Sequence, residues 1–136
     1  MFKLFKVLLL IESSHSYGRG LLRGIANYCR QNTPWEIYRV PPFYRNKNQP
    51  IRDEQKNLFK KIRELKPDGI IVREPSEPLK FIDLQIPFIV SPNKIDDKIP
   101  VILTAHTEIG RMAAQHLMDR GFKNFAYCGY HDKLWS

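Results

Sequence analysis

Short apolar runs alternate along the chain with longer segments in which apolar residues recur at every third or fourth position. A short apolar run between polar residues is typical of a parallel strand that is covered by helices on both faces. The run from Val7 to Ile11 has this pattern, and residues 35–40 alternate and are rich in aromatic and β-branched side chains. We therefore predict strands at residues 6–11, 35–40, 70–72, 86–90, 101–104 and 125–128.

Helices are predicted between most of these strands. Residues 19–31 and 53–65 each carry one apolar stripe at helical spacing, and residues 75–85 indicate a short or broken helix. In the last helix, Thr107 is a candidate N-terminal cap and Gly121 a candidate C-terminal cap. The predicted inner face of that last helix consists of Ile109, Met112, Ala113, His116 and Leu117.

The alternation of strands and helices predicts an α/β fold with an open, mostly parallel sheet and helices on both faces. In such sheets, ligands bind beyond the carboxyl ends of the strands. This rule selects the loops that can form a site before any motif is considered. They are residues 12–18, 73–76, 91–94, 105–108 and 129–135.

The first of these loops carries the richest set of ligand-binding groups. Carboxylates and hydroxyls hydrogen-bond to sugar hydroxyls, an aromatic ring stacks on the apolar face of a sugar, and a helix start offers backbone N–H groups to an anion. Serine-rich loops also cap the helix that follows, so binding and capping both remain open for this loop. The candidate ligand-binding residues are Glu12, Ser13, Ser14, His15, Tyr17, Glu74, Asn93 and His106.

Composition places the chain among single globular domains. Its 136 residues are 43% hydrophobic and 26% charged, and no apolar run approaches the roughly 18–20 residues that span a bilayer. No small-residue cleavage site follows the apolar run near the N-terminus, so we expect a cytoplasmic protein without membrane contact. Cys29 and Cys128 lie in no CxxC or Cys/His cluster, which predicts free buried thiols and no metal site.

The net charge of +8, from 22 basic and 14 acidic residues, raises nucleic acid as a direct partner. The basic residues are dispersed, however, and the densest window, residues 56–66, is typical of the solvated surface of an amphipathic helix. No helix-turn-helix pattern is evident. A direct DNA-binding module is therefore the least favoured hypothesis.

Catalytic motifs are also missing from the sequence. No serine lies in a G-x-S-x-G elbow, and Gly18, Gly20 and Gly24 do not have the G-x-G-x-x-G spacing. The alternative hypothesis is a small α/β enzyme or a flavodoxin-like module. A receiver of that type needs several acidic residues after the first strand, where Glu12 stands alone. We therefore predict neither enzymatic activity nor a cofactor.

Three segments resemble one known family. They are VLLLIESSHSYGRGLLRGIANY at residues 7–28, KPDGIIV at residues 66–72 and AHTEIGRMAAQHLMDRGFKNFAY at residues 105–127. In this order they resemble the ligand-binding domain of the lactose/galactose-repressor family, which has the type I periplasmic-binding-protein fold. The resemblance is nearest to xylose-operon regulators, which add an AraC-type DNA-binding domain.

The resemblance implies an effector cleft between two subdomains, in a homodimeric transcription regulator that senses a sugar such as xylose. Ser13 and Tyr17 fall on effector-loop positions. Ala105 falls where the family has aspartate, and His106 where it has asparagine. By this resemblance, residues 1–136 are the N-terminal part of the sensor domain, and DNA is bound only by a domain outside them. We also expect apolar surface that is left exposed to favour self-association.

Overall fold

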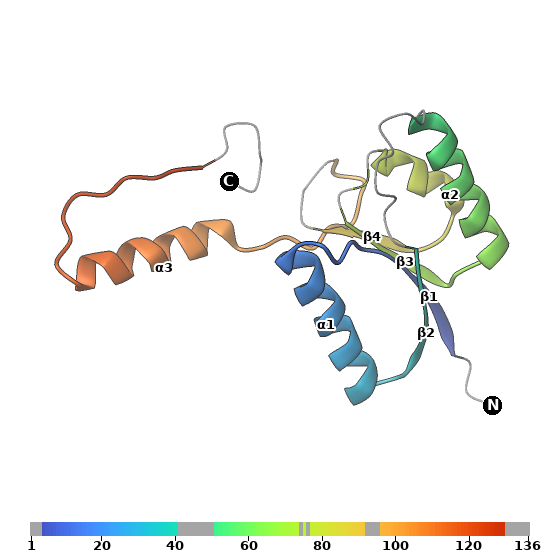
Figure 1. The fold of residues 1–136 in the computed structure, drawn as a ribbon, viewed down its shortest axis with the longest axis horizontal. Coiled ribbons are helices and arrows are strands. Elements are labelled where there is room, and N and C mark those ends of the chain that lie inside the picture. The colour runs from blue at the N-terminus through green and yellow to red at the C-terminus, as the bar shows by residue number, and fades with distance from the viewer. Residues whose placement is uncertain (1–3, 41–50, 74, 76, 92–95, 130–136) are drawn as a thin grey trace.

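Four parallel strands form one sheet in the order β2-β1-β3-β4 (Figure 1). The computed structural model describes residues 4–40, 51–73, 75, 77–91 and 96–129, and only the backbone of residues 51–55. The strands are β1 (Phe5–Leu10), β2 (Trp35–Arg39), β3 (Gly69–Arg73) and β4 (Phe88–Ser91). All three strand pairs are parallel, which confirms the predicted fold class.

Helices cover both faces of the sheet. Helix α1 (Ser16–Gln31) lies on one face, and helix α2 (Ile51–Leu65) lies on the other together with the 3-10 helix η1 (Pro78–Leu84) (Figure 1). Because successive strand residues point to opposite faces, β1 supplies both cores. The α1 side contains Val7, Leu9, Ile11 and Ile25. The α2 side contains Leu8, Leu10, Ile62, Ile70, Val72, Phe81, Val90 and Ile99.

This double coverage explains the uninterrupted apolar run of β1. Leu8 faces Tyr38 of β2 and Ile70 of β3 in register, and it is almost fully buried. A strand between two others, with helices above and below, has no solvent-facing side and therefore needs no polar positions. The helix starts lie a few residues earlier than predicted, since α1 begins at Ser16 and α2 at Ile51.

Two predicted strands are not strands in the structure. At residues 101–104, only Val101 pairs, in a single parallel bridge to Val90. Residues 125–128 do not form a strand in the described part of the chain, and Phe125 and Cys128 are exposed. A strand exists only where a neighbour supplies hydrogen bonds, and Figure 1 shows this segment running far from the sheet. The expectation of buried thiols is also wrong for Cys128, while Cys29 is half-buried and both are free.

Helix α3 (His106–Asp119) forms where a helix was predicted, but it projects away from the sheet (Figure 1). Gly121 closes it with φ +84°, and the N–H groups of Gly121 and Phe122 bond the carbonyls of Met118 and Leu117, as in a Schellman motif. The predicted inner face is not buried, because no element of the described chain covers it. Ile109 is 54% exposed and Met112 65%.

Candidate functional site

The candidate site lies where the strand order reverses. From β1 the chain crosses to β2 on one side, and from β2 it crosses back to β3 on the other side of β1. The connections that leave the carboxyl ends of β1 and β3 therefore run to opposite faces, which opens the position where ligands bind in open α/β sheets. Glu12 follows β1 at this position, and Arg73 is the last residue of β3.

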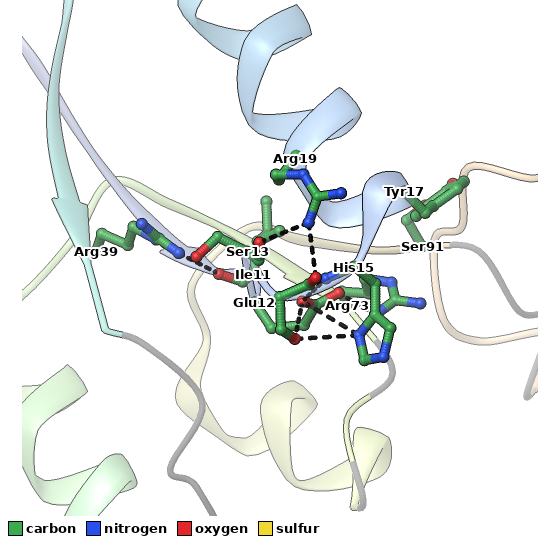
Figure 2. A network of polar contacts seen from close by, with 10 residues as sticks. Ile11, Glu12, Ser13, His15, Tyr17, Arg19, Arg39, Arg73 and Ser91 are labelled. Carbon is green, nitrogen blue, oxygen red and sulfur yellow. Dashed lines mark hydrogen bonds and ion pairs between the residues drawn. The ribbon is translucent and has the colours of Figure 1, made fainter.

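Glu12 and Arg73 form an ion pair across this switch point. The Arg73 Nη1 atom lies 2.6 Å from the Glu12 Oε1 atom, and the two side chains are only 16% and 17% exposed. A charge-assisted hydrogen bond of this length is among the stronger polar contacts in proteins. It ties the carboxyl ends of the two adjacent strands together (Figure 2).

Glu12 is also the centre of a tight turn. Its Oε2 atom accepts hydrogen bonds from the His15 backbone N–H at 2.9 Å and from the Ser14 hydroxyl at 2.7 Å. Burial alone raises the pKa of the Glu12 carboxyl. The His15 N–H, the Ser14 hydroxyl and the positive charge of Arg73 outweigh it and lower this pKa to about 2. Glu12 is therefore an anion across the whole physiological pH range.

Gly18, in the first turn of α1, lets the helix approach this turn closely. It is buried, and a Cβ atom at this position would lie 2.7 Å from the Glu12 Oε1 atom and would collide with the Glu12 carbonyl oxygen. No side chain fits there. A glycine is needed for this close approach rather than for its backbone conformation.

Tyr17 connects the site to β4. Its hydroxyl lies 2.9 Å from the hydroxyl of Ser91, the buried last residue of β4. The centre of the Arg73 guanidinium group lies 5.3 Å from the centroid of the Tyr17 ring, within the range of a cation–π contact. Residues 12, 17, 73 and 91 therefore form one connected group at the carboxyl ends of β1, β3 and β4 (Figure 2).

Two further arginines hold the backbone of the same turn. Arg19 Nη1 donates to the carbonyl oxygens of Ser13 at 3.1 Å and Ser14 at 2.6 Å. Arg39, the last residue of β2, donates from Nη2 to the carbonyl oxygen of Ile11 at 3.4 Å. Figure 2 shows both side chains reaching the turn, one from α1 and one from β2.

The residues predicted for the site divide into four groups. Those that the structure joins into one network through their side chains are Glu12, Ser14, His15 and Tyr17. Ser13 enters it through its backbone carbonyl. His106 is exposed at the start of α3, and no contact within the described chain links it to this network. Glu74 and Asn93 lie outside the described residues.

The arginines and Ser91 were not among the individual residues predicted for the site. Arg73 and Ser91 are the first residues of the predicted site segments 73–76 and 91–94, whereas Arg39 fell inside the predicted strand 35–40 and Arg19 inside the predicted helix 19–31. The rule that ligands bind beyond the carboxyl ends of parallel strands selected the segments that begin at Arg73 and Ser91, and applied to the last residue of β2 it also indicates Arg39.

The capping hypothesis for the serines is wrong. His15 is the N-cap residue of α1, and no side chain caps the helix there. The Ser14 hydroxyl instead bonds the Glu12 carboxylate. The carboxylate accepts the His15 N–H, so it places a negative charge at the helix start, where the helix dipole favours one.

The contacts of Ser14 and His15 do not form a catalytic triad. A triad needs the serine on one ring nitrogen of histidine and the carboxylate on the other. Here the Ser14 hydroxyl lies 3.1 Å from His15 Nδ1, and the Glu12 carboxylate lies 3.4 Å from that same atom. Within the described ranges, no three His, Cys, Asp or Glu side chains gather as metal ligands.

Comparisons of the sequence with models of known protein families and with curated proteins found no match. Among the helices of the described chain, none is both long and apolar enough to cross a bilayer.

Proposed function

We propose that this chain is the effector-sensing part of a sugar-responsive bacterial transcription regulator, and that it binds a small polar ligand without transforming it. The observation that carries the proposal is the Glu12–Arg73 ion pair, which bridges the carboxyl ends of β1 and β3 at the switch point of the sheet. Polar groups that are three-quarters or more buried at this position are characteristic of a binding site.

The groups at this edge suit a polyhydroxylated ligand. The Glu12 carboxylate accepts hydrogen bonds, the Arg73 guanidinium donates them, and the hydroxyls of Ser14 and Ser91 do both. The ring of Tyr17 is 39% exposed beside them and offers a face for the C–H groups of a sugar. Contacts from three strand ends fix these groups in place, so little order has to be gained when a ligand binds.

The resemblance of residues 7–28, 66–72 and 105–127 to the lactose/galactose-repressor family supports the regulatory part of the proposal. On this basis the ligand is a sugar such as xylose, and the regulator acts as a homodimer in the cytoplasm. DNA is then contacted by a domain outside these 136 residues.

The proposal is tested by titrating the protein with a panel of pentoses and hexoses in an isothermal calorimeter. We expect saturable binding of at least one sugar, and a loss of affinity of roughly tenfold to a hundredfold in Glu12→Gln and Arg73→Met, because each removes a charged hydrogen-bonding group. Lys60→Gln is the matched control, since Lys60 is exposed on α2. Equal affinity of wild-type protein and all three variants for the sugar would contradict the assignment of Glu12 and Arg73 to the binding site.

Whether the bound sugar is chemically changed distinguishes the competing hypothesis of a small enzyme from that of a sensor. The sugar that binds is incubated with the protein and followed by proton NMR. We expect the spectrum of the sugar to remain unchanged. A new product that forms with wild-type protein, and not with Glu12→Gln, would favour the enzyme.

A further inference from the structure

Positive charge exceeds negative charge in the network around Glu12. In strand order, the carboxyl edge of the sheet presents Arg39 of β2, Glu12 after β1, Arg73 of β3 and Ser91 of β4. Arg19 of α1 joins them from above the turn (Figure 2). The network therefore contains three guanidinium groups and one carboxylate, and only the Arg73 guanidinium contacts that carboxylate.

The carboxylate compensates only one of these charges. Glu12 pairs with Arg73, whereas Arg19 and Arg39 bind backbone carbonyls within the described chain. A carbonyl accepts a hydrogen bond but carries no charge, so two positive charges at this edge have no counterion among the described residues. Each guanidinium has five N–H donors, and the bonds to the turn use few of them.

The two arginines flank the same short stretch of chain. Arg39 bonds the carbonyl of Ile11 and Arg19 that of Ser13, and atoms two residues apart lie at most about 7 Å from each other along an extended chain. Both side chains are exposed, so their unused donors are accessible to a ligand. The start of α1 adds the positive end of a helix dipole beside them, which the Glu12 carboxylate compensates in part through the His15 N–H.

We propose that the ligand of this site carries an anionic group, a carboxylate or a phosphate, on a polyhydroxylated body, and that Arg19 and Arg39 bind that group. This inference rests on the proposed function and narrows its substrate class from sugars in general to sugar acids or sugar phosphates. Glu12, Arg73 and Tyr17 then hold the hydroxylated body, and the two outer arginines select for charge.

A purely structural role is the competing account of the outer arginines. If Arg19 and Arg39 only brace the turn through its carbonyls, their replacement lowers stability and affects all ligands alike. If they bind an anion, their replacement removes the preference for charged ligands and leaves the affinity for neutral ligands unchanged. The difference between charged and neutral ligands therefore separates the two roles.

The test uses glucose, glucuronate and glucose 6-phosphate, which share one sugar ring and differ in charge. Affinities are measured by calorimetry at 50 and 300 mM NaCl for wild-type protein, Arg19→Gln and Arg39→Gln. Arg23→Gln is the matched control, because Arg23 is an exposed residue of α1 one turn further along. Comparison of glucuronate with glucose 6-phosphate shows whether the site prefers a carboxylate or a phosphate.

We expect wild-type protein to prefer one charged ligand over glucose by roughly tenfold or more, and this preference to weaken at the higher salt concentration. The ratio of the affinity for the charged ligand to that for glucose should fall to near one in Arg19→Gln and Arg39→Gln. It should stay at the wild-type value in Arg23→Gln. Arg39→Lys should keep part of this preference, since lysine retains the charge. If Arg19→Gln does not fold, the Arg39 variants and the salt dependence decide.

The experiment distinguishes failure of this inference from failure of the proposed function. Binding of glucose as tight as that of both charged ligands would overturn this inference and leave the proposed function intact. A charged preference that survives in both arginine variants would overturn the assignment of the residues. Binding of none of the three ligands would overturn the inference, and the sugar panel described above then decides the proposed function separately.

Discussion

Glu12 shows how much of the site depends on one side chain. Its carboxylate contacts Arg73 of β3, the Ser14 hydroxyl and the His15 N–H, and so connects two strands and the start of α1. A residue in this position is difficult to replace, because glutamine keeps the size of the side chain but removes the charge. The surrounding donors would then face a weaker acceptor.

The pKa of Glu12 predicts acid sensitivity. Because the folded pKa, about 2, is lower than the ordinary value of 4.5, the ionised group stabilises the fold fully above about pH 4.5, and this contribution is lost as the pH falls from there toward 2. The shift sets an upper limit of about 3 kcal/mol on this contribution, and screening by solvent lowers it. The unfolding free energies of wild-type protein and Glu12→Gln, measured with urea, should differ most above about pH 4.5 and converge as the pH approaches 2. A difference in unfolding free energy that does not change with pH would show that the charge of Glu12 is not its cause.

Gly18 gives a second prediction at this scale. Gly18→Ala places a methyl group against the Glu12 carbonyl and carboxylate, which should destabilise the protein by about 1–3 kcal/mol and displace the ion pair with Arg73. Gly20→Ala is the control, because nothing lies within 4 Å of the new Cβ, and alanine favours the helix by up to about 1 kcal/mol. Thermal melts of the two variants should therefore shift in opposite directions.

At the scale of elements, the sequence pattern was sufficient wherever an element is packed against the sheet. The run Val7–Ile11 and the stripes of α1 and α2 are apolar because they are buried, so burial could be predicted from them. The pattern at residues 125–128 is equally apolar, but the described residues form no strand there, because the pattern of one segment does not determine which segment it pairs with. Local sequence determines the preference, and tertiary contact determines whether it is realised.

The same reasoning separates the predicted from the unpredicted parts of the site. Glu12, Ser14, His15 and Tyr17 could be predicted because they stand together in one polar loop. Their partners come from strands that end up to 74 residues later in the sequence, as the Tyr17–Ser91 contact shows. Sequence spacing carries no information about which late residue meets which early one, because that depends on strand order and register.

Helices α2 and α3 should respond differently to truncation of an apolar side chain. Ile62→Ala in α2 removes a side chain that is 1% exposed and should cost about 2–5 kcal/mol of unfolding free energy. Ile109→Ala in α3 should change it by less than about 0.5 kcal/mol, since more than half of that side chain is already in water. Chemical denaturation of both variants provides the comparison. A large effect of Ile109→Ala would indicate that α3 packs against another surface in solution.

For the whole molecule, the distribution of apolar surface is uneven. The sheet and its helices bury two cores, whereas α3 and the segment after it expose one large apolar side chain after another. These are Ile109, Met112, Leu117, Met118, Phe122, Phe125 and Tyr127. Such a surface favours association with another protein surface.

We therefore predict concentration-dependent self-association of this chain, in line with the expected homodimer. Sedimentation velocity from micromolar to high micromolar concentration should show a rising mass, and Met112→Lys combined with Phe125→Ser should keep the protein monomeric. The control is Lys56→Ser with Lys60→Ser, two changes on the exposed surface of α2. A monomer at every concentration would contradict the prediction.

The long sequence separations within the site also have a consequence for folding. Glu12 and Arg73 are 61 residues apart, and Tyr17 and Ser91 are 74 apart. The first contact closes only after β3 has docked beside β1, and the second only after β4 has docked beside β3. Contacts of such high separation form late, since the intervening chain must be ordered first. Loss of the Tyr17 hydroxyl in Tyr17→Phe should therefore accelerate unfolding and leave the folding rate nearly unchanged in stopped-flow experiments. The network around Glu12 is complete only in the fully folded molecule, so we expect partially folded chains not to bind the proposed ligand.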